Sequence, residues 1–323
     1  SLFDRPGKRI RQTMRLNDKI PPLSHGFLCY NERVKQNAPK REIGEVCRIA
    51  VWLFLPGIRR ILAKCIVITS GKGGVGKTTV TANLGFRLAS LGKRVCITDA
   101  DFGLNNLDVV TGVENLVVYD VVDCIEGKCR AKQALIQSPV NKNLYILPAV
   151  HSFFKGEVSS ENLKELIDGL SPSFDYILID CPAGIDVGFR RAVSVCSEAL
   201  VVTSSQLSSL RDADKVLAIL RSFRLDYVGL IVNRVRGDLV ADGVVLSPEA
   251  IAGVLKTALL GIIPDDDAVF LNNAGLLPSD SPAARAIKIL ASNLVNGKNR
   301  LYNYKADYVG FFGSIRRSLK RNL

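Results

Sequence analysis

The sequence predicts an α/β protein with a single doubly wound, mostly parallel sheet and helices on both faces. One observation is the recurrence of short runs rich in Val, Ile and Leu, with helical stretches between most of them. These runs are nearly continuous rather than alternating, which is typical of strands covered on both faces. A second observation is a glycine-rich loop that follows the first run and precedes a helical stretch. The expected strands are residues 65–70, 94–98, 144–147, 176–179, 199–203, 228–232 and 259–263.

The first expected strand leads into the sequence Gly-Lys-Gly-Gly-Val-Gly-Lys-Thr-Thr, and residues 79–91 then have helical periodicity. This order of strand, loop and helix is the context of a phosphate-binding loop, so we expect the sheet of a P-loop NTPase. Backbone N–H groups can face phosphate oxygens, Lys77 can reach the β- and γ-phosphates, and the Thr78 hydroxyl can ligate Mg²⁺. The residues expected to bind the nucleotide here are Gly71, Lys72, Gly73, Gly74, Val75, Gly76, Lys77, Thr78 and Thr79.

Acidic or amide side chains follow three other expected strands, at the sheet edge where ligands bind in doubly wound folds. Asp99 and Asp101 follow the second strand, Asp180 the fourth, and Asn233 the sixth. We expect Asp99 and Asp180, with Thr78, to surround Mg²⁺, and Asp101 to hold or polarise the attacking water. Asn233 offers a donor and an acceptor for a purine edge. Taken singly, each of these residues could instead form a turn or cap a helix.

The chain is basic, with a formal net charge of +12, but the surplus is unevenly distributed. Residues 1–63 carry a net +8 and residues 298–323 a net +6, whereas residues 64–297 carry a net −2. A domain that binds DNA or RNA broadly would carry a basic surplus of its own. The central region is therefore expected to have no specific nucleic-acid partner.

Eight cysteines are scattered along the chain and resemble small apolar core residues of a reducing compartment rather than a disulfide framework. Cys124 and Cys129 form the nearest pair, which is weak support for zinc because no second pair or histidine accompanies it. The two histidines indicate no catalytic constellation. The longest apolar run, residues 49–58, has ten residues and contains Pro56, so no membrane-spanning segment is expected.

Four regions are expected along the chain: a basic extension at 1–63, an ATPase domain at 64–297, a polar linker at 298–307 and an amphipathic helix at 308–323. The extension is either a targeting segment or a disordered basic arm. The last helix has an apolar face with basic residues on its flank, as in helices that lie on anionic bilayers; the alternative is docking on its own domain. The residues expected at the membrane are Phe311, Phe312, Ile315, Arg316, Arg317, Leu319, Lys320 and Arg321.

Taken together, these features resemble the MinD family, one of the deviant phosphate-loop ATPases, a class that also includes ParA-type partition proteins. The mark of the class is Lys72, the second lysine of the loop. Stretches such as 143–148, 180–185 and 261–265 are similar to this family in particular. The resemblance covers about residues 64–323, and the basic extension is left unaccounted for.

The resemblance implies a homodimer whose subunits face each other across two ATP molecules, with Lys72 of each reaching the phosphates held by the other. It also implies that Asn233, Pro264 and Asp266 hold adenine. Residues 204–206 read Ser-Ser-Gln where the family usually has Asn-Pro-Glu, which leaves the specificity for partners open. The helix that follows is implied to bind the activating and inhibitory partners through Arg211, Asp212 and Asp214.

The implied function is that of an ATPase that dimerises with ATP, attaches to the membrane and determines the division site by regulating the tubulin-like FtsZ ring. The implied partners are a MinE-like activator, an inhibitor of the division ring and an anionic membrane surface. A basic extension before a bacterial-type core suggests the chloroplast stroma and inner envelope, the alternative being the cytoplasm and inner membrane of a bacterium. Two other classes stay open: a DNA partition ATPase, and an iron–sulfur redox or carrier protein, for which the eight cysteines leave room.

Overall fold

The computed structural model describes residues 62–102, 106–149, 158–272, 275–306 and 308 of the 323-residue chain. The expected basic extension therefore lies outside the described residues except for Leu62 and Ala63. The expected membrane helix also lies outside them except for Tyr308. Both regions remain predictions, and the structure concerns the domain between them.

The described residues form one eight-stranded sheet with the strand order β3-β4-β2-β5-β1-β6-β7-β8. Every pairing is parallel except that of β3 with β4. Each of the seven predicted runs is a strand, and the doubly wound, mostly parallel sheet is confirmed. The short edge strand β3 was not predicted because two residues carry no hydrophobic pattern. The strands are β1 (Lys64–Thr69), β2 (Val95–Asp99), β3 (Ile136–Gln137), β4 (Leu144–Leu147), β5 (Tyr176–Asp180), β6 (Glu198–Thr203), β7 (Tyr227–Val235) and β8 (Ala258–Pro264).

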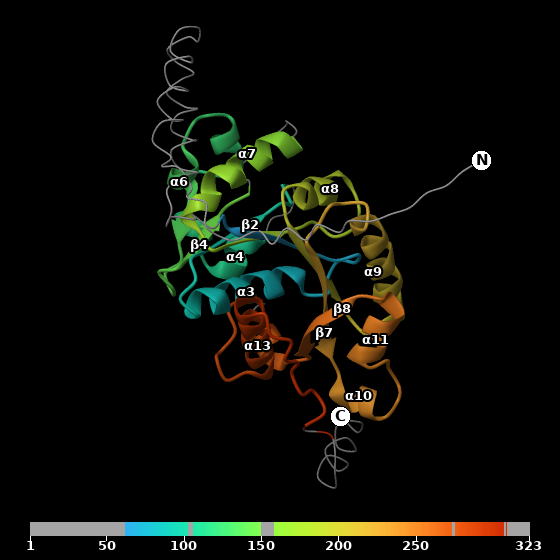
Figure 1. The fold of residues 1–323 in the computed structure, drawn as a ribbon. Helices are drawn as coiled ribbons and strands as arrows, with labels where there is room; N and C mark the ends of the chain where they lie inside the picture. Colours follow the sequence, from blue (N-terminus) through green and yellow to red (C-terminus); the bar gives the residue numbers. More distant parts are fainter. Residues whose placement is uncertain (1–61, 103–105, 150–157, 273–274, 307, 309–323) are drawn as a thin grey trace, which may run out of the picture. The chain divides into compact units, whose positions relative to one another are not determined.

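Helices cover both faces of this sheet (Figure 1). The α-helices are α3 (Lys77–Ser90), α4 (Leu107–Thr111), α5 (Val121–Ile125), α6 (Ala131–Ala134), α7 (Ser160–Leu170), α8 (Val187–Ser194), α9 (Leu207–Leu220), α10 (Gly237–Ala241), α11 (Pro248–Leu255), α12 (Asp267–Leu271) and α13 (Pro282–Asn296). Two 3₁₀ turns, η1 (Glu114–Leu116) and η2 (Ser171–Ser173), complete the described elements. Crossovers between parallel strands contain helices, among them α3, α7, α8, α9 and α11, because each crossover must return the chain to the same edge of the sheet.

Successive residues of the central strand β1 enter two separate hydrophobic cores. Ile66 and Ile68 pack on the face covered by α3 and α13. Cys65 and Val67 pack on the opposite face, which is covered by α7, α8, α9 and α11. Because side chains alternate along a strand, burial of both faces demands an unbroken apolar run, and that is the pattern in the sequence.

The parallel register brings the ends of the central strands together at one edge. Asp99, the last residue of β2, pairs with Asp180, the last residue of β5. Asp180 also lies opposite Ile68, near the end of β1, where the glycine-rich loop begins. Three segments far apart in the sequence therefore place polar groups at one point, which is where doubly wound sheets bind ligands.

Helix α3 follows the loop and packs closely on the sheet. Leu84 and Leu88 are completely buried in the core beneath it. Gly85 faces β2 so closely that an added Cβ atom would lie 2.7 Å from the Cγ2 atom of Ile97. This close approach of the middle of the helix to β2 requires glycine at this position. Among the described helices, none combines the length and apolar character needed to cross a bilayer.

Truncation of the core contact of α3 is expected to destabilise the domain. Leu88→Ala should lower the free energy of unfolding by about 2–5 kcal/mol, because it leaves a cavity in a closely packed core. Leu91→Ala, at the exposed end of the same helix, should change it by less than about 0.5 kcal/mol. Urea denaturation of both variants measures the difference, and equal losses would contradict this account of the packing.

Candidate nucleotide site

The glycine-rich loop joins β1 to α3 and uses glycine where the backbone demands it. Gly74 and Gly76 have φ angles of 75° and 91°, in the left-handed region that other residues avoid. A Cβ atom on Gly76 would also lie 2.4 Å from the Nδ2 atom of Asn233. The predicted phosphate loop is therefore present in a conformation that only this glycine pattern permits, and the helix begins directly after it at Lys77.

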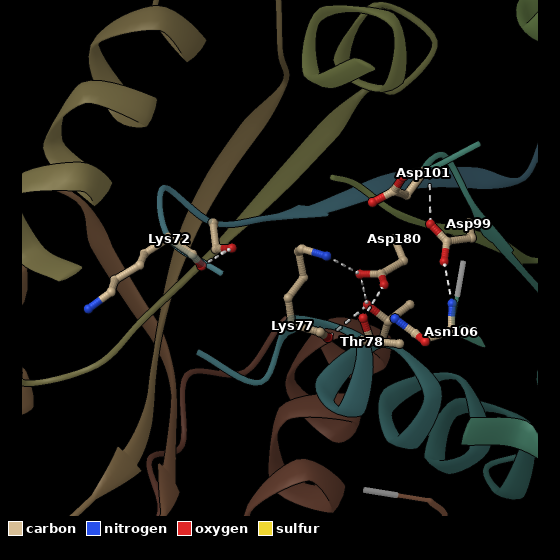
Figure 2. A network of polar contacts seen from close by, with 9 residues as sticks. Lys72, Lys77, Thr78, Asp99, Asp101, Asn106 and Asp180 are labelled. Atoms are coloured by element: carbon tan, nitrogen blue, oxygen red, sulfur yellow. Dashed lines mark hydrogen bonds and ion pairs between the residues drawn. The ribbon is translucent and has the colours of Figure 1, made fainter. Parts of the chain in front are cut away.

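Beneath the loop, Asp180 gathers the polar side chains of the first turn of α3 (Figure 2). Lys77 Nζ lies 3.2 Å from Asp180 Oδ1, and the Thr78 hydroxyl donates to Oδ2 at 2.5 Å. The Thr81 hydroxyl donates to Oδ1 at 3.1 Å. Asp180 is 1% exposed, so these bonds form away from water and hold the predicted phosphate-binding lysine and metal-binding hydroxyl beside one carboxylate.

The second buried carboxylate, Asp99, lies next to Asp180 at the end of β2. It is 4% exposed and accepts the backbone N–H groups of Asp101 at 2.8 Å and Asn106 at 3.4 Å. Burial, and secondly the charge of Asp180, raise the pKa of Asp99 to about 8. Burial likewise raises the pKa of Asp180, against the opposing effect of Lys77. Two buried carboxyl groups thus share a single ammonium group, that of Lys77, and Asp99 keeps its proton up to about pH 8.

This donor set fits Mg²⁺ better than a metal held by protein ligands alone. Among the described residues, no three His, Cys, Asp or Glu side chains gather in a way that could hold a metal ion. Mg²⁺ usually takes one or two protein oxygens and completes its shell with phosphate oxygens and water. Thr78, Asp99 and Asp180 therefore fit as the predicted metal surroundings. A cation would supply positive charge that favours the ionised form of Asp99.

A cavity of about 750 Å³ extends from the phosphate loop to the carboxyl ends of β7 and β8. Its size lies within the range of small-molecule sites. The predicted adenine residues Asn233, Pro264 and Asp266 line this cavity together with the loop. It also has apolar walls that the sequence did not indicate, formed by Val109, Val110, Val269 and Phe270.

Two of the predicted adenine residues have well-defined structural partners. The Asn233 amide donates from Nδ2 to the Val75 carbonyl at 2.7 Å, so it supports the phosphate loop directly. Both carboxylate oxygens of Asp266 accept backbone N–H groups, from Ala268 at 3.0 Å and Ala283 at 2.8 Å. Asp266 thereby caps α12 and ties it to the start of α13. Contact of either side chain with a base remains a prediction.

Lys72 does not join the cluster under its own loop. Its exposed side chain points away from Lys77 and Asp180, as Figure 2 shows, and Nζ donates to Ser208 Oγ at 3.1 Å. The structure thus separates the two lysines of the loop: Lys77 faces the buried carboxylates, whereas Lys72 lies against α9.

The predicted partner surface on α9 adjoins the phosphate loop. A Cβ atom on Gly71 would lie 2.3 Å from the Asp212 carbonyl carbon, so the helix backbone packs directly on the start of the loop. Asp212 is half-buried and pairs with Lys215 at 3.2 Å, while Arg211 and Asp214 are exposed. Of the three predicted partner residues, Asp212 thus lies against the loop, although more than 130 residues separate it from Gly71 in sequence.

Besides the apolar cavity walls, two polar residues at the site were not predicted from the sequence. Thr81 bonds Asp180 because it lies one helical turn after Lys77, a spacing that could have revealed it. Arg234 has a φ angle of 56° at an irregularity between β7 and β8. Its Nη1 atom donates to the Gly74 carbonyl at 3.4 Å. No local sequence pattern predicts this contact, which is the second one between β7 and the loop.

Comparison with known proteins agrees with this geometry. A family model described as an AAA domain matches residues 63–228. A putative septum site-determining protein MinD of Tupiella akineta is 42% identical over 259 residues, covering 78% of this chain and 85% of the relative. The chain belongs to the MinD family. The resemblance seen in the sequence is thereby confirmed.

Solved MinD structures have the same fold. MinD in a MinC:MinD cell division complex of Aquifex aeolicus is 41% identical, with a TM-score of 0.68, and the match covers 74% of this chain and 97% of that one. MinD of Pyrococcus horikoshii, solved in complex with Mg-ADP, is 33% identical with a TM-score of 0.66, covering 73% and 97%. The doubly wound sheet and its phosphate loop are thus those of the MinD family.

The raised pKa of Asp99 makes the stability of the nucleotide-free domain depend on pH. An unfolded aspartate ionises near pH 4, whereas Asp99 in the fold ionises at about pH 8. Between these values the folded state keeps a proton that the unfolded state has released, so folding stability falls as the pH rises. Asp99→Asn cannot ionise and should melt at a higher temperature than the wild type near pH 8.

Thermal melts of the nucleotide-free protein from about pH 5 to pH 8 measure this dependence. The melting temperature of the wild type should fall across this pH range, and that of Asp99→Asn should fall less. Asp168→Asn, on the exposed face of α7, serves as the control and should keep the slope of the wild type. Equal slopes for Asp99→Asn and the wild type would contradict the assignment.

Proposed function

We propose that this protein is an ATPase that switches between a monomer and an ATP-bound dimer and acts in placement of the division site. The observation that carries this proposal is that the two loop lysines have different surroundings. Lys77 lies in the buried cluster with Asp180, whereas Lys72 is exposed beside α9. The family membership and the names of the relatives support the role in division.

The proposed reaction transfers the γ-phosphoryl group of ATP to water, which yields ADP and inorganic phosphate. Backbone N–H groups of residues 71–76 and the Lys77 ammonium would bind the triphosphate and offset its charge. Mg²⁺, held near Thr78 with Asp99 and Asp180 around it, would neutralise charge that develops between the β- and γ-phosphates. Asp101, half-buried just beyond β2, is the residue we assign to hold and orient the attacking water.

Binding of ATP would couple to dimerisation through Lys72. Its contact with Ser208 is exposed and joins an ammonium to a neutral hydroxyl, so little free energy is lost when the side chain leaves it. A triphosphate offers the ammonium a far stronger charge-assisted partner. In the proposed dimer each Lys72 turns from its own α9 to the nucleotide of the other subunit, and hydrolysis removes that attraction.

Lys72→Ala is expected to retain binding of ATP to the monomer and to weaken ATP-dependent dimerisation at least about tenfold, since loss of one partner from a desolvated charge pair costs 2–5 kcal/mol. Lys77→Ala should lose ATP binding itself. Lys132→Ala, an exposed lysine on α6, is the matched control and should behave as the wild type. Sedimentation velocity with and without ATP measures the dimer, and full dimerisation of Lys72→Ala would refute this role.

The membrane helix expected at 308–323 would provide the attachment of that dimer to an anionic surface. The segment before it is held on the domain: the Tyr304 hydroxyl donates to Glu249 Oε2 at 2.9 Å. Gly237 lies so close that an added Cβ atom would be 2.3 Å from the Tyr304 carbonyl oxygen and 2.7 Å from the Tyr308 ring. The chain therefore leaves the domain from a defined point at α10 and α11.

A single such helix would bind only marginally. Its four basic residues contribute at most about 1 kcal/mol each near anionic headgroups. Ordering the helix costs about 1 kcal/mol or more per residue, which offsets much of that gain. Two helices on one dimer make the second insertion intramolecular and raise avidity by about a hundredfold or more. ATP would thus recruit the protein to the membrane, and hydrolysis would release it.

Deletion of residues 309–323 is expected to abolish ATP-dependent binding to anionic vesicles and to leave ATP binding and dimerisation intact. The deletion retains Tyr308, which contacts the domain at Gly237. A variant with Arg316, Arg317, Lys320 and Arg321 changed to Gln tests the electrostatic part separately, and its residual binding should depend little on salt. Vesicle co-sedimentation measures both variants, and undiminished binding of the truncated protein would rule out the anchor.

In the cell, α9 would bind the regulators of the division ring. We assign Arg211, Asp212 and Asp214 to a surface shared by a MinE-like activator and an inhibitor of the FtsZ ring, and one solved relative is described as a MinC:MinD complex. Because this helix packs on Gly71, a partner bound there would act next to the nucleotide. An algal relative and the basic extension support the chloroplast stroma and inner envelope as the place of action.

A further inference from the structure

Two pairs of cysteines bring their sulfur atoms together in the described part of the chain. Cys65 and Cys196 lie 3.3 Å apart, and both are buried in the core beside β1. Cys124 and Cys129 lie 3.4 Å apart, and both are only half-buried. The second pair is therefore within reach of small molecules in solution, whereas the first is not.

The backbone around Cys124 and Cys129 holds the two thiols in place. Helix α5 begins with a capping box in which Asp120 and Asp123 exchange hydrogen bonds with each other's backbone N–H groups. The helix ends in a turn at Gly127, whose φ angle of 76° reverses the chain. The Gly127 N–H donates to the Cys124 carbonyl at 3.1 Å, and the Lys128 N–H donates to the Asp123 carbonyl at 2.9 Å.

Side chains fasten the same turn. Lys128, between the turn and Cys129, pairs with Asp123 at 3.1 Å and with Glu126 at 2.6 Å. Cys124 and Cys129 also pack against the core formed with α6 and α7, at the end of the domain where Figure 1 labels those helices. The turn that carries the two thiols is therefore ordered by its own hydrogen bonds and ion pairs.

We propose that Cys124 and Cys129 form a reversible disulfide, a modification site separate from the nucleotide site. The sulfur atoms need to approach by about 1.4 Å to reach the bond length of about 2.0 Å. We expect rotation of the two side chains within the existing turn to supply an approach of this size. The chain between them is already closed into a loop by its own hydrogen bonds, so oxidation adds little loss of backbone freedom.

The reaction requires an oxidant, and a low-molecular-weight disulfide such as oxidised glutathione supplies it. The Cys129 thiolate attacks one glutathione sulfur and releases the first glutathione as a thiolate. Cys124 then loses its proton and attacks the Cys129 sulfur of the mixed disulfide, which releases the second glutathione. Two protein thiols are oxidised by two electrons, one glutathione disulfide is reduced to two thiols, and the two protons pass to the glutathione thiolates.

The surroundings favour the disulfide over a permanently reactive thiolate. Burial, and secondly the hydrogen bond with Cys129, raise the pKa of the Cys124 thiol to about 12. Asp120 and Asp123 act in the same direction. A disulfide is easier to reduce when the thiolate that reduction releases is stabilised. The surroundings of Cys124 do not stabilise its thiolate, so the disulfide resists reduction. The second step of closure is correspondingly slow at neutral pH.

The test uses the full-length protein exposed overnight to excess oxidised glutathione, followed by denaturation, alkylation of free thiols and mass spectrometry of peptides. The wild type should protect two thiols, at 124 and 129, with a loss of two hydrogen atoms, and dithiothreitol should restore both. Cys124→Ser should instead retain one glutathione on Cys129, because the second step cannot occur. Cys196→Ser, in the buried pair, is the matched control and should still form the disulfide between Cys124 and Cys129.

Circular dichroism and ATP binding of each variant, measured alongside, establish that the fold is intact, since neither thiol lies in the nucleotide cavity. Equal alkylation of Cys124 and Cys129 in treated and reduced protein would overturn the proposal. Protection located at Cys65 and Cys196 instead would overturn it as well. Stable glutathione adducts on the wild type without closure would show two independent thiols and would likewise refute the pair.

Discussion

The site depends on one buried carboxylate, Asp180, at the end of β5. It accepts hydrogen bonds from Lys77, Thr78 and Thr81, so it ties the first turn of α3 to the centre of the sheet. The phosphate loop immediately precedes that turn, and its conformation depends on where the turn is held. Burial of a carboxylate with 1% exposure would cost much free energy without such partners. The positions of Asp180, the first turn of α3 and the phosphate loop therefore depend on one another.

The neighbouring Asp99 shows how the same arrangement keeps a place for a cation. A second negative charge beside Asp180 is unfavourable at these paired positions, so Asp99 keeps its proton up to about pH 8. A cation bound at this point would favour the ionised form of Asp99 and would therefore lower the pKa of that carboxyl group.

Contacts around the loop link the nucleotide site to two distant parts of the chain. Helix α9 packs on Gly71 and receives Lys72 through Ser208. Strand β7 supports the other side of the loop through Asn233 and Arg234 and leads directly into α10, where the segment before the C-terminal tail is packed. The proposed partner surface and the proposed membrane anchor thus both connect to the loop through short, closely packed elements.

Local patterns in the sequence were sufficient to predict the fold class, the seven main strands and the position of the glycine-rich loop. These features are local: continuous apolar runs, helical periodicity and glycines at positions of positive φ can be read without knowing any distant neighbour. The acidic residues after the strands could be predicted to meet because parallel strands end at one edge. Family resemblance extended this reading to Lys72, which the pattern of the loop alone does not explain.

The arrangement of these residues around the loop depends on the tertiary structure. It placed Lys77 with the buried carboxylates and Lys72 against α9, used Asp266 as a helix cap, and brought Arg234 and Thr81 to the site. It also brought the Cys124 and Cys129 sulfur atoms together around a turn. Such choices depend on burial, on the competition of backbone groups for each side chain and on packing between distant segments, which no local pattern contains.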